Sequence, residues 1–84
     1  MTREEVYVMV SSEIALCKGL NGSLIREEMN VFDDLDVIGD DFMFLADEFH
    51  RNIHAKPDRK SYDANLTVGK WVDLLYYAQS NIKT

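Results

Sequence analysis

Apolar residues recur at helical spacing in three parts of the chain, and the first part follows Thr2. Thr2 and Glu5 have the spacing of a capping box, in which each side chain binds the backbone amide of the other residue. Gly19 is a typical residue at a helix end, and Asn21-Gly22 is a turn signal. The pattern therefore predicts a helix from Thr2 to just before Gly19. Its apolar face comprises Val6, Val10, Ile14 and Cys17.

The second periodic segment predicts a helix over residues 40–53. Asp40 and Asp41 suit the positive end of the helix dipole, and Pro57 belongs in the loop that follows. Met43 and Phe44 widen the apolar surface beyond a single stripe. The expected inward-facing residues are Phe42, Leu45, Ala46, Phe49 and Ile53.

A third helix is expected to begin at Thr67, which can cap it. Its helically spaced apolar residues are Val68, Trp71, Val72, Leu75 and Ala78. The polar stretch 56–65 has room for a short helix, and residues 20–38 predict a long connection, apolar enough to pack over the bundle. No strand-like alternation appears, so we predict one all-α domain over 1–84. Its expected core contains Val10, Ile14, Phe49, Ile53, Val68, Trp71, Val72 and Leu75.

Length and composition narrow the class of protein. Eighty-four residues with 46% hydrophobic content make one small globular domain. No apolar run approaches the ~20 residues of a membrane helix, and no signal-peptide pattern follows the start. Cys17 is the single cysteine and cannot form an internal disulfide. We therefore expect a cytoplasmic monomer that binds no membrane.

Charge is unevenly distributed along this acidic chain, whose formal net charge is −6. A negative protein repels phosphates, so we expect no nucleic-acid partner. No Lys or Arg lies between Glu27 and Glu48, whereas the charged residues of 50–60 are basic except for Asp58. This asymmetry indicates either a partner with a basic patch or a solvated surface that keeps the protein soluble. The acids of the segment are Glu27, Glu28, Asp33, Asp34, Asp36, Asp40, Asp41, Asp47 and Glu48.

The order of the elements resembles the acyl carrier proteins, and the resemblance spans nearly the whole chain. Residues 19–75 align with bacterial fatty-acid carriers without a gap. Leu35 falls on the leucine of their Asp-Leu-Gly-x-Asp-Ser-Leu motif, and Thr67-Val68 on the Thr-Val that opens their last helix. The resemblance implies a four-helix bundle with three long helices, one short helix and a long loop after the first.

The chain departs from these carriers where they hold their cofactor. The Asp-Ser-Leu of the family reads Ile38-Gly39-Asp40, and a glycine has no oxygen to carry phosphopantetheine. No other serine lies between Ser23 and Ser61. The sequence is similar to a branch of bacterial carrier-like proteins with Gly-Asp-Asp at this place. The resemblance therefore implies a carrier fold without a cofactor.

Other chemistry has little support in the sequence. Asp34-x-Asp36 is the only fragment of a calcium-binding loop, so we expect solvated acids rather than a metal site. His50 and His54 have zinc-compatible spacing without further ligands, and we expect both at the solvent-facing side or edge of their helix. Cys17 is interpreted as a small core residue, and no phosphate-binding glycine loop appears. We therefore expect no metal and no enzyme activity.

Three functions remain open. The first is a non-carrying adaptor that binds another protein, and the second is a small acidic inhibitor of a basic bacterial toxin. The third is a carrier with an atypical attachment. Phe44 is either covered by the long loop or exposed as an apolar anchor. The predicted partner-binding residues are Asp33, Asp34, Asp36, Asp40, Asp41, Phe44, Asp47 and Glu48.

Overall fold

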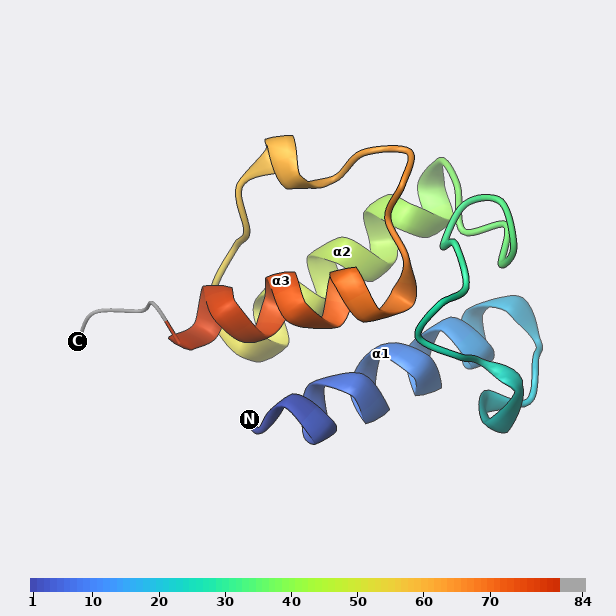
Figure 1. Cartoon of the computed structure of the whole chain (residues 1–84), viewed down its shortest axis with the longest axis horizontal. Coiled ribbons are helices and arrows are strands. Elements are labelled where there is room, and N and C mark those ends of the chain that lie inside the picture. The colour runs from blue at the N-terminus through green and yellow to red at the C-terminus, as the bar shows by residue number, and fades with distance from the viewer. Residues whose placement is uncertain (81–84) are drawn as a thin grey trace.

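A computed structural model describes residues 1–80 of the chain as three α-helices without β-strands, which confirms the all-α prediction. The helices are α1 (Arg3–Lys18), α2 (Asp40–Ile53) and α3 (Val68–Ser80). Two single 3-10 turns, η1 (Gly22–Leu24) and η2 (Arg59–Ser61), lie in the connections. All three helices pack against one another, and α1 runs opposite to α2 and α3 (Figure 1). Within residues 1–80, no helix is both long and apolar enough to cross a membrane.

The predicted ends of α1 are confirmed in atomic detail. The Thr2 hydroxyl accepts the Glu5 amide at 3.1 Å, and the Glu5 carboxylate accepts the Thr2 amide at 2.7 Å. Gly19 closes the helix with φ of 67°, a left-handed conformation that favours glycine. Because these signals involve residues close in sequence, local pattern alone could locate them.

The core combines all three helices with the connection between α1 and α2. Every residue of the predicted core is buried, and Phe49 packs edge-on against Trp71 with ring centroids 5.0 Å apart. Phe42 is half-buried, stacked on Trp71 at the edge of the core, and Ala78 is also half-buried. The connection contributes further buried residues: Ile25, Val31, Leu35 and Val37.

The prediction that Cys17 lies in the core is wrong, because its side chain is exposed. The buried residues of α1 include instead Ser11 and Ala15, and Ala15 lies beside Gly22 of η1. Lys18, four residues after the buried Ile14, takes the next position along the inner stripe, and its side chain is mostly covered. A lysine stem can cover apolar surface while its ammonium group reaches polar partners.

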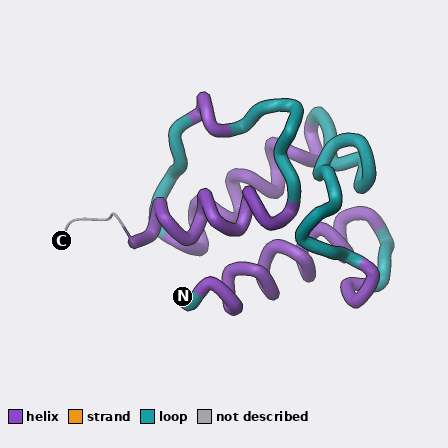
Figure 2. Tube along the Cα trace, in the orientation of Figure 1, coloured by secondary structure: helices purple, strands orange, loops and turns teal. Residues whose placement is uncertain are grey.

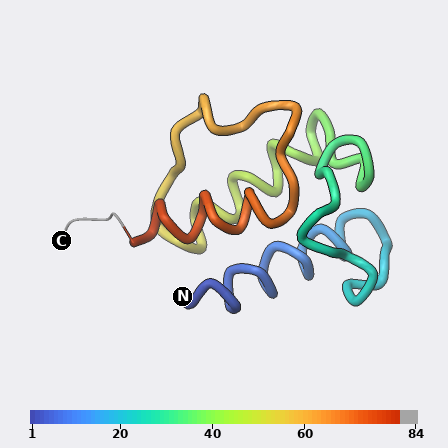
Figure 3. Tube along the Cα trace, viewed as in Figure 1, coloured from blue at the N-terminus to red at the C-terminus, as the bar shows by residue number. Residues whose placement is uncertain are grey.

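The segment between α1 and α2 runs beside the start of α3 (Figures 2 and 3), and backbone pairing holds it there. The amide of Val31 binds the carbonyl of Leu66, and the amide of Val68 binds the carbonyl of Met29, both at 2.9 Å. Between them, Asn30 and Thr67 form an antiparallel β-bridge. We refer to the paired residues 27–31 and 66–69 as the loop–α3 joint.

The connection between α2 and α3 returns along the bundle, so both helices run in the same direction (Figure 1). Where the sequence predicted a short helix, the structure has only the turn η2, capped by the Asp58 carboxylate, which accepts the Lys60 amide at 3.0 Å. Tyr62 follows this turn and packs edge-on against Phe42, with centroids 5.5 Å apart. An aromatic side chain therefore anchors an otherwise polar connection to α2.

Candidate functional site

One face of α2 points away from the core and carries two large apolar side chains. Met43 is 65% exposed and Phe44 is 60% exposed, and Ile38, just before the helix, is 53% exposed. The alternative in which the long connection covers Phe44 is therefore wrong. Asp40 and Asp47 lie three or four residues from this pair, on the same side of the helix. The exposed face of α2, defined here by Ile38, Asp40, Met43, Phe44 and Asp47, is an apolar centre with acidic neighbours.

Gly39 precedes α2 in a backbone conformation that suits glycine alone. Its φ of 57° and ψ of −127° lie in the mirror image of the extended region, which other residues avoid. It makes no side-chain cap, although its carbonyl accepts the Met43 amide at 3.1 Å. A Cβ at this position would meet no atom within 4 Å, so backbone strain rather than crowding disfavours other residues.

Several acids of the segment 27–48 are paired with cations from elsewhere in the chain. Lys18 lies 3.0 Å from Asp41 and 3.7 Å from Asp36, and it joins the end of α1 to the start of α2. Lys18 donates a hydrogen bond to Asp41, and this bond raises the pKa of Lys18. Lys18 lies outside the acidic segment, so the run of acids alone could not reveal this pairing.

Arg3 makes a second network at the other end of α1. Its guanidinium lies 2.7 Å from both Glu27 and Asp73, which ties the long connection and α3 to α1. The hydrogen bond from Arg3 lowers the pKa of Glu27. Glu48 pairs with Arg51 at 2.8 Å one turn later on α2. The expectation of an acidic segment without counter-charges is therefore wrong for these carboxylates.

Asp34 has a structural role that the sequence did not reveal. Its carboxylate accepts the backbone amide of Asn30 at 2.7 Å. The side chain of Asn30 in turn accepts the amides of Phe32 and Asp33, both at 2.8 Å. Asp34 therefore helps to fold the turn before α2. Among the described residues, Asp33, Asp40 and Asp47 make no ion pair, which makes them better candidates for contact with a partner.

The two histidines near the end of α2 differ in burial, and His54 lies at the solvent-facing position that the sequence predicted. His54 is exposed and ends α2 with a left-handed φ of 55°. His50 is instead half-buried, and its Nε2 lies 2.9 Å from the Tyr62 hydroxyl. Within residues 1–80, no three His, Cys, Asp or Glu side chains come together to hold a metal ion. The aromatic Tyr62 in a polar stretch was the one sequence signal that could have indicated this contact.

The chain matches no model of a known protein family, and no curated protein shows significant similarity to it.

Proposed function

We propose that this protein is an acyl carrier protein-like module that carries no cofactor and acts as an adaptor, binding another protein through the exposed face of α2. The order of the elements supports the likeness: a long connection after α1 and a short helical turn before α3. In this proposal the three α-helices and η2 correspond to the three long helices and the short helix of the carriers.

The conformation of Gly39 supports the absence of an attached group. The proposal assigns Gly39 to the position of the carrier serine, immediately before the second long helix. Its positive φ favours glycine, so this turn is built around a residue that has no attachment oxygen. A serine here would have to adopt a strained backbone or remodel the start of α2.

The observation that carries the adaptor function is the exposure of Phe44 and Met43 among unpaired acids. Aromatic side chains at the centre of an interface often supply most of its binding energy. Asp40 and Asp47 beside them would attract a basic surface and raise the rate of encounter. We therefore propose a protein partner with a hydrophobic pocket surrounded by Lys and Arg.

Attachment of a cofactor is tested by incubating the protein with coenzyme A and a broad-specificity phosphopantetheinyl transferase. We expect an unchanged intact mass, while a fatty-acid carrier in the same reaction gains one phosphopantetheine. Such a gain on any residue of this chain would establish a carrier with an atypical attachment and overturn the proposal.

The interface is tested by placing a photo-crosslinking amino acid at position 44 and, as a control, at the exposed Ser12 on α1. We expect a specific product from position 44 only, in extracts of the native host. A lipid or polyketide enzyme in that product supports the adaptor. A basic toxin domain would instead support an inhibitor, and equal products from both positions would place the interface elsewhere.

Once a partner is identified, association kinetics separate charge from apolar contact. Asp33→Asn combined with Asp47→Asn should slow association at low salt, and the difference should shrink as salt screens the charges. Phe44→Ala should mainly speed dissociation. Glu4→Gln, which removes an exposed acid near the start of α1, should leave both rates unchanged. Salt-independent association with normal binding by these variants would rule out this face.

A further inference from the structure

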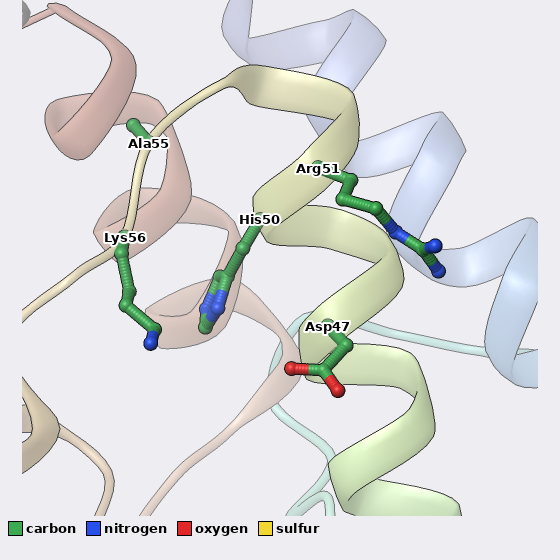
Figure 4. Close-up of a pocket in the computed structure, with 5 residues that line it drawn as sticks. All are labelled: Asp47, His50, Arg51, Ala55 and Lys56. Atoms are coloured by element: carbon green, nitrogen blue, oxygen red, sulfur yellow. The ribbon is translucent and has the colours of Figure 1, made fainter.

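A groove runs between the second half of α2 and the connection that follows it (Figure 4). Its volume is about 510 Å³, and a smaller hollow of about 200 Å³ adjoins it. The two share Asp47, His50 and Lys56 in their walls. The hollow adds an apolar and aromatic lining from Phe42, Met43, Ala46 and Tyr62, together with Arg59.

The aromatic wall of this groove is held in place by several contacts. The His50 and Tyr62 rings are nearly parallel, with centroids 6.1 Å apart, and the hydroxyl of Tyr62 lies 2.9 Å from His50 Nε2. Burial raises the pKa of Tyr62 to about 12, so its hydroxyl keeps its proton. His50 Nδ1 is buried and has no hydrogen-bond partner among residues 1–80. The wall therefore contains a fixed imidazole whose buried Nδ1 lacks a partner among these residues.

The charges that line the groove differ in sign from the protein as a whole. Lys56 and Arg59 belong to the connection, and neither makes an ion pair among the described residues. Figure 4 shows Lys56 extending beside His50, while Arg51 points to the other side of α2, where it pairs with Glu48. Asp47 is the one carboxylate in the lining of both hollows. Two unpaired cations therefore face one carboxylate on a chain of net charge −6.

We propose that this groove binds a small molecule in which an oxyanion, a phosphate or a carboxylate, is attached to a short apolar or aromatic body. The oxyanion lies between Lys56 and Arg59, whose charges attract it and whose N–H groups donate to it. The apolar body lies over Phe42 and Ala46 in the adjoining hollow. This ligand site adjoins the exposed face of α2 and shares Met43 and Asp47 with it, but neither cation belongs to that face.

The site is tested by following backbone amide resonances of the whole chain while phenyl phosphate is added at low ionic strength. Inorganic phosphate and benzyl alcohol serve as separate probes of the anion and of the ring. We expect phenyl phosphate to give saturable shifts at residues 43–47 and 55–62, and each simpler probe to bind more weakly. Shifts that do not saturate, or that spread over all three helices, would overturn the proposal.

Two charge variants sharpen the test. Lys56→Gln with Arg59→Gln should weaken binding of phenyl phosphate roughly fivefold, because two exposed ion pairs are lost. Asp47→Asn should strengthen it roughly twofold, since a repelling carboxylate is removed. Arg26→Gln with Lys70→Gln removes the same charge from exposed positions elsewhere and should have no specific effect. Equal weakening by this control pair, or weaker binding by Asp47→Asn, would contradict a defined site.

Discussion

Gly69 lies so close to Glu27 that a side chain at position 69 would collide with it. A Cβ on Gly69 would be 2.9 Å from Glu27 Oε1 and 3.3 Å from the Glu27 carbonyl oxygen. The amide of Gly69 also donates to that carbonyl at 2.9 Å. The loop–α3 joint therefore depends on a residue without a side chain at the start of α3.

We predict that Gly69→Ala destabilises the protein, although alanine is the better helix former. Crowding at a packed contact costs about 1–3 kcal/mol, which exceeds the gain of about 1 kcal/mol in helix propensity. Denaturant unfolding measures the difference. Gly22→Ala is the matched control, because its Cβ would meet only Ala15 at an ordinary 3.8 Å. Equal stability of the Gly69→Ala protein and the natural protein would show that Glu27 moves away from the added methyl group at little cost in free energy.

Removing the side chains of two phenylalanines of α2 should change the stability of the protein by very different amounts. Phe49 is fully buried against Trp71, so Phe49→Ala should cost about 3–5 kcal/mol through lost burial and a cavity. Phe44 is largely exposed, so Phe44→Ala should change the free energy of unfolding by no more than about 0.5 kcal/mol. Both variants are compared by thermal and denaturant melts. A large loss of stability for Phe44→Ala would mean that Phe44 packs against the protein in solution.

Stability should fall as pH drops below about 6.5, because of His50. Burial, and then the charge of Lys56, lowers the pKa of this imidazole below its ordinary 6.5 in the folded protein. The unfolded chain, with the ordinary value, therefore takes up the proton first as the pH falls. The stability contributed by neutral His50 is full above pH 6.5 and is lost as pH falls toward the lowered value.

The measurement is the free energy of unfolding from pH 7.5 to about 3. His50→Gln should flatten the slope below pH 6.5, whereas His54→Gln, at an exposed position, should retain it. A further loss below about pH 4.5 is expected in both variants, since hydrogen bonding from Arg3 lowers the pKa of Glu27 from 4.5. An unchanged slope in His50→Gln would assign the effect to another group.

Cys17 should react slowly for an exposed cysteine. Local desolvation of the sulfur, and then the nearby carboxylate of Asp41, raises the pKa of this thiol, and only the thiolate is a strong nucleophile. Asp41→Asn should therefore speed alkylation by iodoacetamide at pH 8. Asp47→Asn, which removes the same charge elsewhere on α2, should leave the rate unchanged. Equal rates for all three proteins would show that Asp41 does not control the thiol.

The elements of this fold were predictable because their signals are local. The capping box joins Thr2 and Glu5, which lie within one turn of each other. Gly19, with its left-handed backbone, directly follows Lys18, the last residue of α1. The spacing of apolar residues likewise identified the buried face of α2. Cys17 was misplaced because an apolar residue at the margin of a helical stripe can fall on either side of the buried surface.

The candidate site was predictable only in part, since its geometry depends on distant residues. The acids before and within α2 were visible in the sequence, but their partner Lys18 comes from α1. Likewise, His50 is half-buried because Tyr62, twelve residues later, folds back onto it. Whether Phe44 is exposed depends on the path of the connection between α1 and α2, and no local pattern specifies that path.

The loop–α3 joint also determines how the molecule carries mechanical load. Backbone pairing of residues 27–31 with residues 66–69 closes the chain between them into a ring that contains all of α2. Tension applied to the two ends of the described chain acts on the direct contacts between α1 and α3, such as the Arg3–Asp73 ion pair, and then on the joint. As long as those main-chain hydrogen bonds hold, α2 lies outside the path of the force. A protein pulled from its ends should therefore release α2 only after the joint has broken.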